Sequence, residues 1–480
     1  MAFALDKPDR NRGIIEVTGE VLHRMAEGLG FNWYSCYGPE TYPAPGDDGR
    51  WARIFAHAEW LNMRFIRFGQ SAGRISDDAG TFRPDDLSFD QLRRVNGWAE
   101  RWGASIVLDP FGIPKAFQYE PWPGAPGVWG REGSYHLGVR DIDAYVGRFV
   151  VPYVRHVVRE LGCRAVTWFN HVNEPLRGAV CATPPGIDDH ARYVEVLKAI
   201  RQGLDEAGLS GIGNMGPDTH THHYWPIDHM LEIGADPDPA IQAYCMHHYQ
   251  SRFDWDAPTG VVNSKPMTET VEQHLRRYCR YAQGKRKPYL VTEIGMFHFG
   301  WATGDPAGIA RHDNSVLEAE FIVRGMAEGA DGFLRWAWLN PGTHDGWWQL
   351  IDTVGGSDAP LRDPYHGYGT LYRYVSRRPE IVKVEVAQET GGGPRTIHAT
   401  ATINADGSRT LLVVNDSYAT CAPVTVRLPT GGAAVVRKIV NDPVRKHHEC
   451  EPLAVSGGAI EIADALSPMS LTVYTTCEKS

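Results

Sequence analysis

The chain has 480 residues, of which 42% are hydrophobic and 22% charged, and its formal net charge is −10. This composition is that of a folded globular protein and excludes a chain that is disordered throughout. The acidic balance, with no basic run longer than Lys285–Lys287, argues against a nucleic-acid partner and against binding to an anionic membrane.

The eight cysteines are scattered, and none forms a C-x-x-C pair. This spacing argues against a zinc knuckle or a thioredoxin-type redox site. Residues 1–10 lack the apolar segment of a signal peptide, and no apolar run reaches the about 18 residues that a membrane span needs. We therefore expect a cytoplasmic protein with free thiols and no membrane partner.

From the N-terminus onward, eight short apolar runs alternate with longer amphipathic stretches. The stretches have helical spacing, as in residues 142–161, where large apolar side chains recur every four positions. Eight strand–helix units predict an α/β fold, a closed (β/α)8 TIM barrel. An open, doubly wound sheet is the alternative, but the Gly-rich phosphate loop that normally follows its first strand is missing. The eight runs are residues 30–37, 63–70, 105–111, 166–174, 211–218, 241–249, 289–296 and 332–340.

The pattern changes near residue 380, where apolar and polar residues begin to alternate with period two. The alternating segments, such as residues 396–403 and 410–414, are separated by turns such as Asn404–Gly407. This arrangement predicts an antiparallel β-sandwich of about 100 residues. We therefore divide the chain into a barrel domain, residues 1–378, and a β-sandwich domain, residues 379–480.

Two glutamates end strands that are otherwise apolar. Glu174 lies in Asn-Glu-Pro at the end of the fourth run, and Glu293 lies in Thr-Glu-Ile-Gly in the seventh. Active sites of such barrels lie at the C-terminal ends of the strands, so both side chains should face the same mouth. A barrel radius of roughly 7 Å would leave the two carboxyl groups about 5–6 Å apart. That separation is typical of retaining glycoside hydrolysis, and the wider spacing of inverting enzymes stays open as the alternative.

The motifs Asn173-Glu174-Pro175 and Thr292-Glu293-Ile294-Gly295 resemble the clan A glycoside hydrolases, whose catalytic glutamates lie on strands four and seven. The resemblance covers about residues 28–378 and is loosely to families 5 and 39. It implies that Glu174 is the acid/base, that Glu293 is the nucleophile, and that Asn173 binds the sugar 2-hydroxyl.

Four further residues match positions that the clan uses around its substrate. Arg67 on the second strand would keep the nucleophile ionised. His247 and Tyr249 are two residues apart on the sixth strand and share a face, and the clan's tyrosine there bonds the nucleophile. Trp338, near the end of the eighth strand, matches a platform beneath the sugar.

Two residues near these positions are expected to be structural, and one position departs from the clan's pattern. His248 points away from the face of His247, and Trp336 lies deeper than Trp338 and is interpreted as core. Many family 5 members carry a histidine at the end of strand three, where this chain has Asp109. Asp109 or Gln118 would then do the equivalent work.

The sequence thus predicts a retaining O-glycosyl hydrolase that acts on a carbohydrate or glycoside by double displacement, without metal or cofactor. Four long aromatic-rich loops would enclose a pocket and favour exo-action on a small oligosaccharide or glycoside. These loops are residues 117–131, 220–225, 297–301 and 343–348.

Two other functions stay open. Asp218 and the segment His220–His223 could bind a metal ion and make the chain a metal-dependent barrel hydrolase. The other is a catalytically inactive carbohydrate-binding protein, against which the presence of both glutamates argues.

Overall fold

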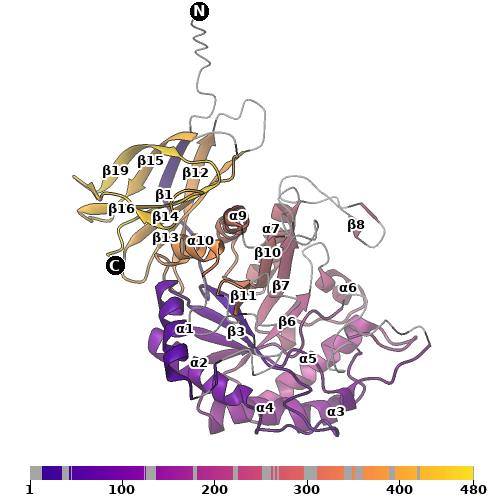
Figure 1. Ribbon diagram of the computed structural model, residues 1–480. Coiled ribbons are helices and arrows are strands. Elements are labelled where there is room, and N and C mark those ends of the chain that lie inside the picture. Colours follow the sequence, from indigo (N-terminus) through magenta and orange to yellow (C-terminus); the bar gives the residue numbers. More distant parts are fainter. Residues whose placement is uncertain are drawn as a thin grey trace, which may run out of the picture.

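The computed structural model of the chain is shown in Figure 1. It describes residues 13–34, 43–44, 46–123, 125, 137–176, 181–219, 225–250, 261–262, 265–266, 270–296, 311–339, 349–351, 361–388, 395–418 and 422–478.

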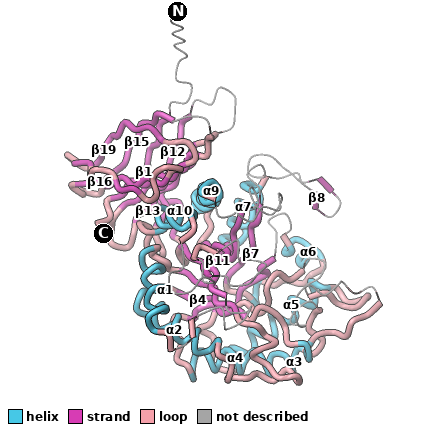
Figure 2. The backbone as a smooth tube through the Cα atoms, in the orientation of Figure 1, coloured by secondary structure: helices cyan, strands magenta, loops and turns pink. Residues whose placement is uncertain are grey.

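The barrel consists of eight parallel strands: β2 (Leu29–Tyr34), β3 (Phe65–Gly69), β4 (Ser105–Asp109), β5 (Val166–Phe169), β6 (Gly213–Thr219), β7 (Ala243–Gln250), β10 (Tyr289–Met296) and β11 (Gly332–Leu339). They close in the order β10-β11-β2-β3-β4-β5-β6-β7, which confirms the predicted (β/α)8 barrel. Helices surround the ring of strands (Figure 2). Strands such as β3, β4 and β11 are buried along their whole length, which explains their nearly continuous apolar sequences.

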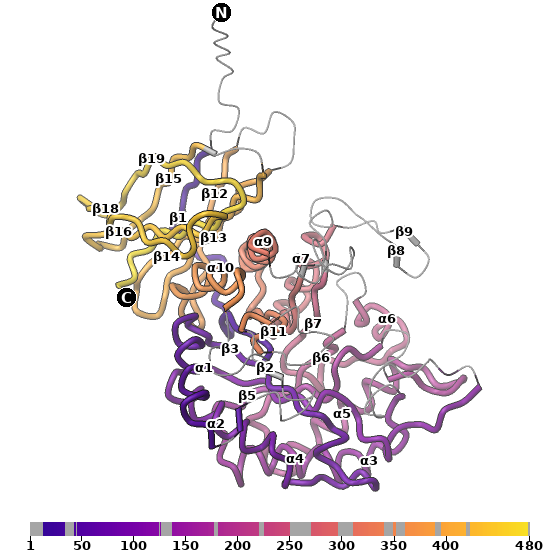
Figure 3. Tube along the Cα trace, viewed as in Figure 1, coloured from indigo at the N-terminus to yellow at the C-terminus, as the bar shows by residue number. Residues whose placement is uncertain are grey.

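The helices of the barrel domain are α1 (Asp48–Trp60), α2 (Ser88–Trp102), α3 (Ile142–Tyr145), α4 (Val151–Arg155), α5 (Asp189–Glu206), α6 (Pro226–Glu232), α7 (Val271–Gly284), α9 (His312–Glu328) and α10 (Asp363–Tyr372). Short segments are the 3-10 helices η2 (Lys115–Phe117) and η5 (Asp238–Ala240) and the π-helical segments η3 (Val146–Val150) and η4 (His156–Glu160). The strands β8 (Val261–Val262) and β9 (Lys265–Pro266), labelled in Figure 3, pair antiparallel. Several helices begin at capping residues that the sequence supplies. Asp47, Asp141 and Asp188 accept backbone N–H groups at the starts of α1, α3 and α5.

The second domain is one sheet that curls into a sandwich. Its strands are β1 (Gly13–Arg24), β12 (Glu380–Gln388), β13 (Ile397–Ile403), β14 (Arg409–Asn415), β15 (Ala422–Pro429), β16 (Val435–Asn441), β17 (His448–Glu449), β18 (Leu453–Ala454), β19 (Ala459–Leu466) and β20 (Ser470–Thr475). They pair in the order β17-β16-β20-β14-β13-β12-β1-β15-β19, with β18 beside β16. Val382, Leu411 and Val426 belong to the apolar core that the curled sheet encloses. The predicted β-sandwich, mainly antiparallel, is thereby confirmed.

The first strand of the chain lies in this sheet and not in the barrel. β1 pairs antiparallel with β12 and parallel with β15, and Figure 1 shows it as an indigo strand among orange and yellow ones. Ile15 and Val17 face the sandwich core. The predicted division had placed residues 1–378 in the barrel. Sequence reasoning missed β1 because its partners lie near the other end of the chain, and such long-range pairing leaves no local signal.

Two helices join the domains. α9 and α10 pack against strands of the curled sheet, and α9 is buried along nearly its whole length, as expected of a helix enclosed on all sides. Leu412, Ile439 and Leu471 of the sheet belong to the same apolar core as the helical layer of the barrel. His312 Nε2 donates to the Met469 carbonyl at 2.8 Å. The domains therefore share a continuous core.

Among the residues that the structure describes, no helix is long and apolar enough to cross a bilayer. The cysteines in the same part of the chain are free thiols, as predicted: Cys163, Cys181, Cys245, Cys279, Cys450 and Cys477. Cys36 and Cys421 lie outside the described residues.

The place of β1 predicts that substitutions at two adjacent residues will differ sharply in their effect on stability. Ile15 is fully buried in the sandwich core, whereas Ile14 is 40% exposed. We expect Ile15→Ala to lower the free energy of unfolding by about 2–5 kcal/mol, because it leaves a cavity in a packed core. Ile14→Ala should change it by roughly 0.5 kcal/mol or less. Urea unfolding measures both, and equal effects would contradict the assignment of β1 to the sandwich core.

Candidate active site

The barrel interior changes from apolar to polar along the strands. Phe65 and Cys245 belong to an apolar layer inside the barrel. Because side chains alternate in direction along a strand, residues two positions further on face the same interior. Arg67 follows Phe65 in this way, and His247 and then Tyr249 follow Cys245. The C-terminal ends of the strands thus turn polar groups toward one mouth.

Arg67 lies at the centre of this polar layer. Its side chain is fully buried, and its Nη2 lies 2.5 Å from Asp109 Oδ2 and 2.8 Å from Asp218 Oδ2. The same nitrogen donates to Asn173 Oδ1 at 2.6 Å, and Nη1 donates to Glu293 Oε1. One guanidinium thereby connects residues at or just after the ends of β4, β5, β6 and β10.

The structure brings the two glutamates together on either side of His247. His247 Nδ1 lies 2.8 Å from Glu174 Oε1 and 3.3 Å from Glu293 Oε2. An oxygen of one carboxylate lies within 4.8 Å of an oxygen of the other. The Tyr249 hydroxyl donates to Glu293 Oε2 at 2.8 Å. The Glu174 side chain is 26% exposed and that of Glu293 only 5%, so Glu174 lies nearer to solvent.

Two residues that sequence reasoning did not assign to the site in this role lie at β-bulges. The pairing of β7 with β10 skips Thr292, and the pairing of β6 with β7 skips Asp218. Bulges at barrel rims re-aim side chains. Here Thr292 Oγ1 donates to Asp218 Oδ1, and Asn170 Nδ2 donates to Asp218 Oδ2 at 2.7 Å. The available signal was their position, since Asp218 ends an apolar run and Thr292 precedes Glu293.

The two aspartates beside Arg67 titrate in opposite directions. Burial raises the pKa of Asp109 above its usual range, and the nearby Arg67 does not fully offset this effect. Burial would also raise the pKa of Asp218, but Arg67 and His247 outweigh it and hold that pKa well below its usual range. Asp218 therefore stays ionised and balances the positive charge of the guanidinium.

His247 and Glu293 form a tightly coupled buried pair. Burial opposes protonation of His247, but Glu293 and Asp218 overcome it and raise the pKa of the imidazole to about 10. Burial raises the pKa of Glu293 to about 7, against the lowering effect of His247 and Arg67. Arg67 lowers this pKa, which is the expected direction, but the ionised form of Glu293 is still lost as the pH falls through about 7.

Glu174, His247 and Glu293 also have the spacing of a metal site. Their charge state does not suit one, because a metal ligand must be an unprotonated imidazole, whereas the raised pKa of His247 keeps it protonated at neutral pH. The Arg67 guanidinium, which contacts Glu293, adds a second positive charge. The residues present therefore favour carboxylate chemistry over metal chemistry.

The backbone at the site is held in an uncommon conformation. Glu174 has φ = 50° and Asp218 has φ = 54°, both in the left-handed region. For residues other than glycine this costs on the order of 1–3 kcal/mol each. The contacts of Glu174 with His247 and of Asp218 with Arg67 help to hold the two residues in place.

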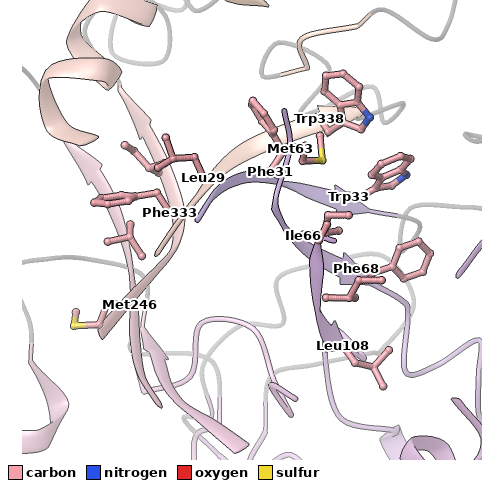
Figure 4. Close-up of a cluster of buried hydrophobic side chains, with 14 of the residues drawn as sticks. Leu29, Phe31, Trp33, Met63, Ile66, Phe68, Leu108, Met246, Phe333 and Trp338 are labelled. Atoms are coloured by element: carbon pink, nitrogen blue, oxygen red, sulfur yellow. The ribbon is translucent and has the colours of Figure 1, made fainter. Parts of the chain in front are cut away.

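Trp338 lies in a different place from the one predicted. It is fully buried, with its ring 5.6 Å from that of Phe31 and 6.2 Å from that of Trp33, in the layer between the barrel and its helices (Figure 4). The regular alternation that would turn Trp338 inward with Leu334 breaks down here. Arg335 pairs with Phe31 but Leu339 pairs with Trp33, so β11 advances by four residues while β2 advances by two. The prediction of a sugar platform at Trp338 is therefore wrong.

The remaining predicted residues divide between site and framework. His248 Nε2 lies 2.7 Å from the Tyr289 hydroxyl and is buried on the outer face, as expected. Asp109 contacts Arg67, whereas Gln118 donates to the Ile113 carbonyl at 2.7 Å. The segment His220–His223 and most of the aromatic loops (residues 124, 126–136, 220–224, 297–310 and 340–348) lie outside the described residues.

Comparison with known proteins identifies the fold. No protein-family profile matches the sequence, and no curated protein matches it. Among solved structures, a GH30 endoxylanase from Clostridium papyrosolvens C71 is similar, with a TM-score of 0.65, 15% identity, and coverage of 96% of this chain and 99% of that one. A glucosidase from Croceicoccus marinus has a TM-score of 0.63 and 13% identity, with coverage of 97% and 98%. An endo-β1,6-glucanase has a TM-score of 0.62 and 14% identity, with coverage of 97% and 94%.

These neighbours are clan A glycoside hydrolases, so the predicted resemblance to the clan is confirmed at the level of the fold. The xylanase belongs to family 30, a different family from the two to which the motifs show a loose resemblance. Identities of 13–15% show a common fold that covers both the barrel and the sandwich.

The contacts of Arg67 predict a pH-dependent loss of stability. Arg67→Met leaves Asp218 and Glu293 buried beside His247 but without the guanidinium, which should lower the free energy of unfolding by about 3–5 kcal/mol at pH 7.5. The deficit should shrink at pH 5.5, because without Arg67 the folded pKa of Asp218 rises, and protonation in the folded state then offsets part of the loss. Urea unfolding at the two pH values tests this, with Arg67→Lys as the charge-retaining control. Equal stability of Arg67→Met and the parent at both values would contradict the central role of Arg67.

Proposed function

We propose that the chain is a retaining glycoside hydrolase, with Glu293 as nucleophile and Glu174 as acid/base. The observation that carries the proposal is the close approach of the carboxylates: both contact His247 Nδ1, and an oxygen of one lies within 4.8 Å of an oxygen of the other. Retaining enzymes hold their carboxyl groups about 5–5.5 Å apart, whereas inverting enzymes leave about 6.5–9.5 Å for a water molecule. The fold, shared with a xylanase, a glucosidase and a glucanase, supports a carbohydrate or glycoside substrate.

The surroundings of the two glutamates suit different steps. Tyr249 and Arg67 donate to Glu293 and fix its carboxylate for attack. A Glu293 oxygen forms an ester bond to the anomeric carbon as the bond to the leaving oxygen breaks, and the more exposed Glu174 gives its proton to that oxygen. Glu174 then takes a proton from water, and the water oxygen displaces Glu293 from the anomeric carbon. The proton is thus returned, and the sugar keeps its configuration.

His247 has a supporting role in this scheme. A protonated imidazole 3.3 Å from Glu293 stabilises its carboxylate during attack, and the same nitrogen lies 2.8 Å from Glu174. Asn173, held at 2.6 Å by Arg67, precedes Glu174 and is the residue expected to bind the sugar 2-hydroxyl.

The size of the substrate and the mode of attack stay predictions. The predicted exo-action rests on aromatic loops of which most residues lie outside the described ones. Two of the similar structures are an endoxylanase and an endo-β1,6-glucanase, so an open groove is the alternative. Slow loss of viscosity of a polymeric substrate at high sugar release would support the pocket, and rapid loss would exclude it.

The configuration of the first product tests the mechanism. Aryl glycosides of both anomers are screened for hydrolysis, and the anomer released from the best substrate is followed by NMR before mutarotation. We expect the first product to have the configuration of the substrate. A product of opposite configuration would overturn the double displacement, and hydrolysis of no glycoside in a screen that includes xylosides and glucosides would favour a sugar-binding protein.

Substitutions distinguish the catalytic roles proposed for the two glutamates. Glu293→Ala should abolish turnover, and Glu293→Gly with added azide should recover part of it, because azide can replace the lost nucleophile. Glu174→Ala should slow hydrolysis of unactivated glycosides by about 10²–10⁴-fold, and should affect p-nitrophenyl glycosides less because their leaving group needs little protonation.

The matched control is Glu385→Gln, on a side chain that is 61% exposed in the sandwich. It should have the parent's activity. Activity of Glu174→Ala or Glu293→Ala within about tenfold of the parent on an unactivated glycoside would refute the assignment.

A further inference from the structure

Two imidazoles and a carboxylate meet between α5 and α6, and none of them belongs to the polar cluster around Arg67. Asp188 is the N-cap residue of α5, His190 lies in the first turn of that helix, and His229 lies on the neighbouring α6. One nitrogen or oxygen atom from each residue lies within 4.8 Å of the other two. None of these residues has a part in the proposed hydrolysis.

The spacing of the three groups is close to that of metal ligands. His229 Nε2 lies 3.2 Å from Asp188 Oδ2, and His190 Nδ1 lies 3.8 Å from Asp188 Oδ1. The imidazole rings meet edge to face with centroids 4.6 Å apart. Ligand atoms at 2.0–2.1 Å from a tetrahedral zinc ion are about 3.3 Å from one another. Small side-chain rotations would therefore bring all three groups onto one ion.

Neighbouring groups also support this arrangement of ligands. Asp188 Oδ1 accepts the backbone N–H groups of His190 and Ala191, so the capping bonds do not use Oδ2. Glu232 Oε2 lies 3.8 Å from His229 Nδ1, the nitrogen that does not face Asp188. Carboxylates in that position orient metal-bound histidines.

We propose that Asp188, His190 and His229 bind a zinc ion, with water completing its coordination. Two imidazole nitrogens and one carboxylate oxygen suit zinc, whereas calcium and magnesium take oxygen ligands. The side chains of Asp188 and His229 are 41% and 39% exposed, which gives water access to the ion. The ion would tie the start of α5 to α6 and so fix two helices that follow adjacent barrel strands. The carboxylates of Asp188 and Glu232 offset the partial positive charge at the start of α5.

The structure offers a substitution that removes the ligand and keeps the helix cap. Asn caps helices about as well as Asp, so Asp188→Asn preserves the start of α5 while it removes the anionic ligand. Zinc is titrated by calorimetry into the full-length protein freed of metal. We expect the parent to bind one zinc ion at this site with a Kd of about 1 μM or tighter. Asp188→Asn, His190→Ala and His229→Ala should each weaken binding at least tenfold. The zinc-dependent rise in melting temperature should be lost in the same variants.

The matched control is Asp141→Asn, because Asp141 caps α3 in the same manner and lies outside the cluster. It should bind zinc with the parent's Kd. Cobalt(II) provides a second readout: its visible absorption should be that of an N,O-coordinated ion in the parent and should weaken in His190→Ala and His229→Ala.

Other groups could take the ion instead, and three variants distinguish them. Glu293→Gln affects the catalytic cluster, Glu320→Gln affects the buried Glu320–His398–Asp416 cluster, and the triple alanine variant of His220, His222 and His223 affects the segment before α6. Each should retain the parent's affinity. Loss of binding in one of them, with Asp188→Asn and both histidine variants unaffected, would overturn the proposal. A parent Kd weaker than about 100 μM would overturn it as well.

Discussion

The geometry of the mouth depends on one buried cation. A charge removed from water is costly unless it is paired and hydrogen-bonded, and Arg67 is fully buried. Asp109, Asp218 and Glu293 surround its guanidinium, and Asn173 accepts a further hydrogen bond. These residues belong to different barrel strands or the segments that follow them. Compensation of a single charge therefore fixes the position of the nucleophile candidate and of the residue before the acid/base candidate.

The barrel achieves this arrangement through irregular strands. Regular alternation alone brings Arg67, His247 and Tyr249 to the interior. Bulges at Asp218 and Thr292 add the carboxylates of Asp218 and Glu293. Because Leu290 faces the interior and Val291 the helices, regular alternation would have turned Glu293 outward. Thr292 donates to Asp218, which in turn contacts Arg67, so the irregular positions support the regular ones. Local backbone strain is here offset by polar contacts.

The curled sheet supports the barrel through α9. Glu318 on this helix pairs at 3.2 Å with Arg335 on β11, and Glu320 on the same helix lies 3.4 Å from His398 on β13. α9 thus makes a buried ion pair with the last barrel strand and a buried polar contact with the sandwich. Because the apolar core is also continuous across the junction, the sandwich is part of the framework that holds β11 in place.

Local sequence determined what depends on local physics. Apolar runs, helical spacing and period-two alternation predicted eight barrel strands and a sandwich, and the strand-end positions of Glu174 and Glu293 placed both glutamates at one mouth. Three features were decided only by tertiary structure. β1 joins strands far along the chain, and Asp218 enters the site through a bulge whose cost is offset by Arg67. Trp338 turns outward because the pairing of β11 with β2 loses its regular register. Each depends on contacts between distant segments, and a residue's own neighbours in sequence carry no record of such contacts.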